Sequence, residues 1–435
     1  MGEVRVPLDA LYGAQTQRAV ENFAVGAHRF QLPLIKALGL VKACAARVNA
    51  DLGVLPRELA LAIERAANAI AEGAHYEQFV VNVFQTGSGT STNMNANEVI
   101  ARLANAHPND HVNSSQSSND VIPSTIHIAA AVEMRNQLLP ALELLSAALE
   151  NRAVAFWDVV KIGRTHLQDA TPMRLGQEFR GYAQQVSSCA ERVTLALDGI
   201  YELPLGGTAV GTGVNAPPAF AERTIALIAE RTGLPFREAR NHFEAQAAKD
   251  AVSFLSGALK TCAVALTKVA NDIRWLGSGP RGGLGEIRLP ELQPGSSIMP
   301  GKVNPVIPES LLMICAQVMG YDAAITWGCA AGNFELNVMM PVIAYDLLDS
   351  IELLTAGVRN FTLRCVNGIE ANRDKTGALV EQSLAMATAL TPEIGYDRAT
   401  AIAKEAYETG RTVREVAIEK SGLSEAKIAE LLRFD

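Results

Sequence analysis

The stretch that decides the fold is LGQEFRGYAQQVSSCAERVTLALDGI, residues 175–200. Its apolar positions alternate steps of four and three residues, the heptad spacing of helices that pack along one another. These positions are Leu175, Phe179, Tyr182, Val186, Cys189, Val193, Ala196 and Ile200. The segment predicts a helix about 40 Å long, at 1.5 Å of rise per residue, with one buried seam.

Two further segments, 255–276 and 347–361, have the same alternation, and the apolar runs 126–149 and 311–331 have the length of long helices. Alternating β-branched runs, which would predict strands, are short. We therefore predict an all-α fold class with a long central bundle of five helices.

Glycine and proline interrupt the helical pattern at several places, and two of these breaks predict domain boundaries. The boundaries lie near residues 117 and 366. They divide the chain into an N-terminal helical domain (1–117), a central domain of long helices (118–366) and a small C-terminal helical domain (367–435).

The composition favours a protein whose surfaces are partly hidden in an oligomer. Of the 435 residues, 49% are hydrophobic and 19% are charged, below the roughly 25% charged residues of typical soluble domains. The 38 basic residues are outnumbered by 46 acidic ones, a net charge of -8, so we expect no nucleic acid partner.

Cysteine spacing and hydropathy indicate the compartment. The six cysteines form no CxxC pair, which argues against a zinc site or a disulfide framework and favours a reducing cytoplasm. The one membrane candidate, 311–331, contains Asp322 and Gln317, so we predict a helix buried in protein and no membrane partner. The amino terminus has no export or targeting pattern.

Two glycine-rich stretches resemble nucleotide motifs but lack their context. Residues 277–282 match GxGxxG after a helix rather than a strand, and 295–302 has the wrong spacing for a phosphate loop. GxSxG and HExxH are both missing from the sequence. We expect no cofactor and no metal.

Four polar clusters interrupt the apolar pattern: Thr86–Asn95, His111–Asp120, Gly163–Asp169 and Gly295–Pro305. Their hydroxyls, amides and glycine N–H groups, with Arg164 and Lys302, are donors suited to carboxylates, and a histidine and a serine supply proton chemistry. Each cluster alone is also explained as a capped loop. Four such clusters together are harder to explain as capped loops, because long helices in a bundle can bring distant loops to one point.

The clusters resemble conserved blocks of one superfamily. GSSIMPGKVNP (295–305) is similar to the signature loop of the fumarase/aspartase superfamily, and the other blocks follow in the right order over nearly the whole chain. Within the superfamily, class II fumarate hydratases are the most similar group in four sequence motifs: QSSND, GRTHLQDA, LGGTAVGTG and NFELNV. The resemblance implies reversible hydration of fumarate to L-malate, and a three-domain, all-α homotetramer with a twenty-helix core and active sites shared between subunits.

The resemblance also implies roles for individual residues. Ser296 is the expected catalytic base, His166 acts through water on the departing hydroxyl, and Glu309 orients His166. The expected substrate-binding residues are Ser88, Gly89, Thr90, Ser117, Ser118, Asn119, Thr165, Ser297, Lys302, Val303 and Asn304. An accessory dicarboxylate site would use His107, Pro108, Asn109 and Asp110, for which a helix-capping role is an equal alternative.

Two rival functions remain open at this point. An aspartate ammonia-lyase shares the serine loop, and residues 306–309 (VIPE) are closer to that enzyme, whereas Ser118 is less typical of it. A non-catalytic helical structural protein would have the same fold without the site residues.

Overall fold

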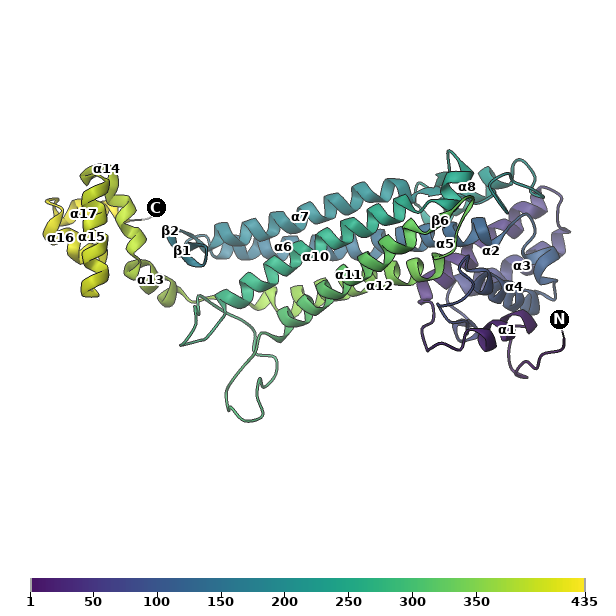
Figure 1. Cartoon of the computed structure of the whole chain (residues 1–435), viewed down its shortest axis with the longest axis horizontal. Coiled ribbons are helices and arrows are strands. Elements are labelled where there is room, and N and C mark those ends of the chain that lie inside the picture. The colour runs from purple at the N-terminus through teal and green to yellow at the C-terminus, as the bar shows by residue number, and fades with distance from the viewer. Residues whose placement is uncertain (1, 434–435) are drawn as a thin grey trace. The chain divides into compact units, whose positions relative to one another are not determined.

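The computed structural model describes residues 2–433 and is built almost entirely of helices (Figure 1). The α-helices are α1 (Ala14–Asn22), α2 (Leu32–Asp51), α3 (Arg57–Ala71), α4 (Thr90–Ala104), α5 (Ser118–Glu133), α6 (Leu139–Ala155), α7 (Leu175–Ile200), α8 (Phe220–Thr232), α9 (His242–Ala247), α10 (Asp250–Leu276), α11 (Val306–Ala330), α12 (Met340–Arg364), α13 (Arg373–Gln382), α14 (Thr391–Ile394), α15 (Tyr396–Thr409), α16 (Val413–Lys420) and α17 (Glu425–Leu431).

Strands are short and occur only in pairs. The longest pair is the antiparallel hairpin of β1 (Val160–Thr165) and β2 (Gln168–Arg174). The others are β3 (Glu202–Leu203) with β4 (Arg237–Glu238), β5 (Ile287–Arg288) with β8 (Glu370–Ala371), and β6 (Gly332–Asn333) with β7 (Leu336–Asn337). The prediction of an all-α fold class is confirmed.

The described chain forms two compact units. Unit 1 comprises residues 2–141, 189–264 and 314–356, and unit 2 comprises residues 142–188, 265–313 and 357–433. Each unit is described separately below. The predicted domain boundaries near 117 and 366 stay predictions.

The heptad segments form the expected helices. The segment 175–200 is α7, 255–276 lies within α10, and 347–361 lies within α12. The seam side chains are buried, since Val193 and Val358, for example, have no exposed surface. The apolar run 311–331 corresponds to α11, which buries Leu311, Cys315, Val318, Asp322 and Ile325, again in steps of four and three.

By length and composition alone, α10 and α11 could each cross a membrane. The same composition is found in core helices of globular proteins, and both helices bury a heptad seam in this structure. The seams therefore explain the hydropathy of α10 and α11 without a membrane.

The run 126–149 is helical throughout but consists of more than one helix. A π-helical turn, Met134–Leu138, joins α5 to α6. Pro140 is the second residue after this turn. Its ring nitrogen has no hydrogen to donate to the preceding turn, which accounts for the change of helical pitch.

A buried charge cluster in unit 2 fixes the β1–β2 hairpin. Both terminal nitrogens of Arg164 donate to the carboxylate of Glu286, at 3.0 and 2.9 Å. Lys161 Nζ lies 2.9 Å from a Glu178 oxygen and 3.4 Å from a Glu286 oxygen. Glu286 and Lys161 are buried, so these charges depend on one another for the solvation that water would otherwise provide.

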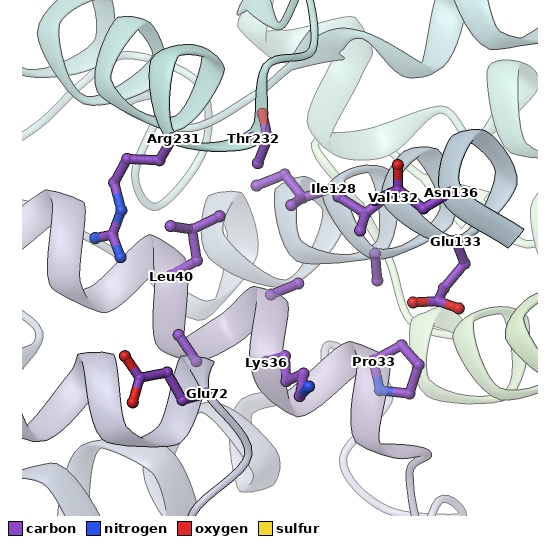
Figure 2. Close-up of a pocket in the computed structure, with 13 residues that line it drawn as sticks. Pro33, Lys36, Leu40, Glu72, Ile128, Val132, Glu133, Asn136, Arg231 and Thr232 are labelled. Atoms are coloured by element: carbon purple, nitrogen blue, oxygen red, sulfur yellow. The ribbon is translucent and has the colours of Figure 1, made fainter.

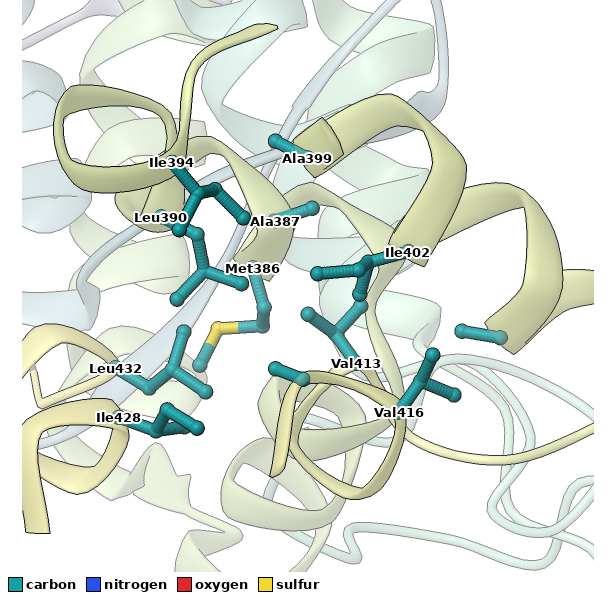
Figure 3. Packing of buried hydrophobic residues seen from close by; sticks show 12 residues of the cluster. Met386, Ala387, Leu390, Ile394, Ala399, Ile402, Val413, Val416, Ile428 and Leu432 are labelled. Carbon is teal, nitrogen blue, oxygen red and sulfur yellow. The ribbon is translucent and has the colours of Figure 1, made fainter. Parts of the chain in front are cut away.

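The C-terminal part of unit 2 has its own apolar core (Figure 3). Met386 and Leu390 come from a 3₁₀ segment, and Ile402, Val416 and Ile428 come from α15, α16 and α17. Figure 3 shows these side chains converging from separate elements. The short helices therefore stabilise one another through one shared core.

We predict that Glu286→Gln destabilises the protein by about 3–5 kcal/mol, because removing one member of a buried ion cluster leaves the others uncompensated. The matched control is Glu150→Gln, since Glu150 pairs with Arg180 at the surface, where loss of an ion pair costs about 1 kcal/mol or less. Urea denaturation followed by circular dichroism compares the two. Equal shifts of the unfolding midpoint would contradict the assignment.

Candidate active site

Three hydroxyl groups form a chain in unit 1, at the start of two helices. Ser88 Oγ and Thr90 Oγ1 are 2.7 Å apart, and Thr90 Oγ1 is 2.7 Å from Ser118 Oγ. Thr90 is the first residue of α4 and Ser118 the first residue of α5. Helix starts carry partial positive charge, which favours negative charge nearby, so the cluster suits a carboxylate.

Glycines shape the loop that precedes α4. Gly89 adopts a φ of 74°, a left-handed conformation that favours glycine. A Cβ on Gly87 would lie 1.9 Å from the carbonyl oxygen of Val338, and Gly87 itself accepts a hydrogen bond from Met340 N. The NFELNV segment therefore packs directly on the backbone of this polar loop.

Asn119 and Ser117 complete the polar group of unit 1. Asn119 Nδ2 donates to the carbonyl oxygen of Ala209 at 2.8 Å, which fixes the plane of its side-chain amide. Ser117 is the N-cap of α5, where its hydroxyl and the Asp120 side chain form a capping box. The structure thus brings Ser88, Gly89, Thr90, Ser117, Ser118 and Asn119 into adjoining segments of one unit.

The carboxylate of Asp120 holds this group to a second loop. It accepts backbone N–H groups from Ser117, Gly206 and Thr208 at 2.9 to 3.0 Å. Burial raises the pKa of Asp120, and these three N–H groups lower it. Sequence analysis did not single out Asp120, although the pattern Ser117-x-x-Asp120 is a readable capping signal.

Ser296 lies in a closed loop of unit 2. Its Oγ accepts backbone N–H groups from Ile298 at 3.2 Å and Met299 at 3.0 Å. Gly295 N donates to the Lys302 carbonyl at 2.7 Å, which closes the loop at its base. The tip is open, since the side chain of Ile298 is 84% exposed. Two donors on one hydroxyl oxygen stabilise negative charge on that oxygen.

The other expected residues of this loop differ in how freely their side chains can bind a substrate. Lys302, Ser297 and Val303 are exposed. Asn304 Nδ2 donates one hydrogen to the carbonyl oxygen of Gly295 at 2.8 Å, so this amide helps to close the loop and keeps its second N–H for another partner.

His166 occupies the turn of the β1–β2 hairpin. Thr165 pairs with Gln168, which leaves His166 and Leu167 as the two central residues, with φ of 56° and 60°. Such a turn is usually made of asparagine and glycine, and other residues there are strained by about 1–3 kcal/mol each. The turn holds His166 and Thr165 exposed, as a group that must reach a substrate requires.

Arg164 does not have the free guanidinium that a carboxylate-binding role requires, and the role of Glu309 stays a prediction. Arg164 was expected to help grip a carboxylate, but both of its terminal nitrogens bind Glu286. Glu309 lies in the first turn of α11. Within residues 2–433, the structure contains no hydrogen bond or ion pair between Glu309 and His166.

The accessory-site residues form a helix cap. His107 is the N-cap of a π-helical turn, Pro108–Val112, and its Nδ1 accepts the N–H of Asp110 at 3.0 Å. His107 N in turn donates to His111 Nδ1. The capping alternative explains these contacts, and the accessory dicarboxylate site stays a prediction.

A separate cavity of about 330 Å³ lies among α2, α5 and α8 in unit 1 (Figure 2). Its charged lining residues are two acids and two bases, Glu72, Glu133, Lys36 and Arg231. None of the predicted site residues lines it. In the described part of the chain, no group of three or more His, Cys, Asp or Glu side chains is arranged to hold a metal ion.

The site residues therefore fall into two groups. Unit 1 contains the serine, threonine and asparagine donors, and unit 2 contains the Ser296 loop, the His166 hairpin and Glu309. One group supplies neutral donors at helix starts, and the other supplies a serine, a histidine, a carboxylic acid and a lysine. Together they suit acid–base chemistry on a small carboxylic acid.

Comparison with known proteins agrees with this chemistry. The pattern of a family described as lyase matches residues 2–320, and that of the fumarase C C-terminus matches residues 386–435. The fumarate hydratase class II of Mycobacterium tuberculosis is 54% identical, over 97% of this chain and 90% of its own length. That of Thermosynechococcus vestitus is 50% identical, over 100% of this chain and 96% of its own.

A solved structure gives the same answer. The class II fumarase from Schistosoma mansoni has a TM-score of 0.96 with 40% sequence identity, and the match covers 99% of this chain and 96% of that one. The resemblance seen in the polar clusters is confirmed, and the chain belongs to the lyase family of class II fumarate hydratases.

Proposed function

We propose that this chain catalyses the reversible hydration of fumarate to L-malate, with Ser296 as the base. The observation that carries the proposal is the pair of backbone N–H groups on Ser296 Oγ. A serine hydroxyl is a poor base unless its alkoxide is stabilised, and two fixed donors provide that stabilisation. The names of the two bacterial relatives, at 50% and 54% identity, support the same reaction.

The reaction requires removal of a weakly acidic proton. In the direction of dehydration, the Ser296 alkoxide takes the proton from the malate carbon next to a carboxylate, and the electron pair moves into that carboxylate. The pair then returns to form the carbon–carbon double bond as the hydroxyl leaves. The hydroxyl takes a proton, supplied through water by His166, and departs as water.

The developing charge on the carboxylate is the main barrier, because it adds a second negative charge to one group. We propose that Lys302 and Asn304 bind this carboxylate. Thr165 and the hydroxyl chain of Ser88, Thr90 and Ser118 would bind the rest of the substrate and its water. Asn119 is positioned for this by its bond to Ala209. Ser297, Ser117, Gly89 and Val303 would shape these contacts.

We propose that the protein acts as a homotetramer in which each site uses residues of several subunits, built around a twenty-helix core. Large apolar side chains on α10 and α11 are exposed in the single chain, Phe254 at 58%, Met313 at 68% and Trp327 at 80%. Burying these side chains between copies would be favourable. In such an assembly Glu309 would orient His166 across a subunit boundary.

We also propose a cytoplasmic location. The six cysteines form no disulfide with one another, as is typical of proteins in a reducing compartment.

We predict that Ser296→Ala lowers the turnover rate by a factor of about 10² to 10⁴, the usual contribution of a general base. The urea midpoint should stay unchanged, because the loop tip is exposed. Ile298→Ala, which shortens an exposed side chain of the same loop, is the matched control and should keep near wild-type activity. If both variants have similar rates, Ser296 only shapes the turn.

The identity of the leaving group, water or ammonia, is the remaining alternative. VIPE at 306–309 is closer to aspartate ammonia-lyases, which release ammonia. We predict that fumarate alone yields L-malate and that added ammonium yields no aspartate. Fumarate's ultraviolet absorbance gives the rate, and chromatography identifies the product. Aspartate as the main product would overturn the hydratase assignment and leave the serine mechanism intact.

A further inference from the structure

A lysine is completely buried beneath the polar group of unit 1. Lys42 lies on α2 and has no exposed surface. Its Nζ donates to the side-chain oxygen of Asn113 at 3.0 Å. Within residues 2–433, no carboxylate lies within ion-pair distance of this ammonium. Asn113 is therefore its chief polar partner.

Asn113 Oδ1 joins two helices, α2 and α4. It accepts hydrogen bonds from Lys42 on α2 and from the Nδ2 atoms of Asn93 and Asn97 on α4, both at 3.1 Å. Three donors around one oxygen fix the orientation of the amide, because a flipped amide would direct its own N–H groups at them. The Nδ2 of Asn113 is thereby directed to the carbonyl of Gln116, at 3.1 Å.

These contacts lead to both substrate-binding segments of unit 1. Gln116 immediately precedes Ser117, the N-cap of α5, and so leads into Ser118 and Asn119. Asn93 lies on the first turn of α4, which begins at Thr90. The Thr90–Ser118 hydrogen bond then joins the two segments. Lys42 is therefore linked to both the Thr90 segment and the Ser118–Asn119 segment through Asn113 alone.

A buried ammonium is a costly way to stabilise a fold. Burial lowers the pKa of Lys42 to about 7, while the charge of Asp120 raises it. Well-packed apolar residues of similar volume often replace buried charges without loss of stability. A positioning role explains the lysine better, because its Nζ donates to the same Asn113 oxygen that binds two side chains of α4.

We propose that Lys42 is a positioning residue for dicarboxylate binding, holding Asn113 and through it the segments that contain Thr90 and Ser118–Asn119. This inference rests on the proposed function. Because Lys42 serves the donors of unit 1 and not the Ser296 loop, its loss should affect substrate binding more than proton transfer.

The test is Lys42→Met in the full chain, which removes the charge and keeps most of the side-chain volume. The KM for fumarate and for L-malate should rise at least about tenfold, the effect of losing one hydrogen bond to a charged group. The kcat should change by much less. Amide hydrogen exchange at residues 113–119 should become faster, and this readout does not depend on activity.

Two control variants separate positioning from general stability. Val41→Ala removes a buried side chain of the same helix and should lower the unfolding midpoint without changing KM. Lys36→Met makes the same substitution on α2, at the wall of the separate cavity. It should leave both the unfolding midpoint and KM unchanged.

A double-mutant cycle with Asn113→Ala tests the route of the effect. If Lys42 acts through Asn113, the KM of the double variant should equal that of the single variants, and additive effects would overturn the proposal. An unchanged KM in Lys42→Met, or a rise matched by Val41→Ala, would also overturn it. If Lys42→Met does not fold, Asn113→Ala must raise KM by itself, and a normal KM there decides against the proposal.

The same measurements distinguish failure of the proposed function. If the wild-type chain makes no malate from fumarate, the hydratase assignment fails and takes the dicarboxylate role of Lys42 with it. The hydrogen-exchange comparison still decides whether Lys42 holds residues 113–119.

Discussion

Four helices of 25 to 27 residues, α7, α10, α11 and α12, each bury an apolar seam over their length. A helix with such a seam has few positions for reactive polar groups along its middle, since an unpaired polar group there would be costly to bury. The chemistry is therefore confined to helix starts, turns and loops. Ser118, His166 and Ser296 all lie at such positions.

Placement at helix starts also explains which donors are used. Backbone N–H groups are unpaired at the start of a helix and in tight turns, and they need no side chain of their own. At the start of α5 one such N–H binds the Ser117 hydroxyl, and in the Ser296 loop two of them bind the Ser296 hydroxyl. Charged residues are instead found in supporting positions, where Asp120 and Glu286 hold loops and the hairpin in place.

The sequence alone predicted the long helices because a seam is a local pattern with a fixed period. It also contains, in the expected order, the polar motifs from which the family was identified. It did not predict the β1–β2 hairpin, because His166 and Leu167 replace the asparagine and glycine that usually signal such a turn. The pairs Arg164–Glu286 and Lys42–Asn113 are separated by 122 and 71 residues, and no local pattern specifies such partners. Arg164 was consequently named as a donor suited to carboxylates, whereas its guanidinium binds Glu286.

The central proposal is that the donors of unit 1 and the residues proposed for proton transfer in unit 2 serve one reaction across copies of the chain. Mixing two inactive variants tests it most directly: one with Ser296→Ala, the other with Ser118→Ala and Asn119→Ala. After joint unfolding and refolding, mixed oligomers should regain a substantial part of the wild-type rate of malate formation, because some sites receive both intact groups. Verified mixed oligomers that stay as inactive as the separate variants would contradict the account.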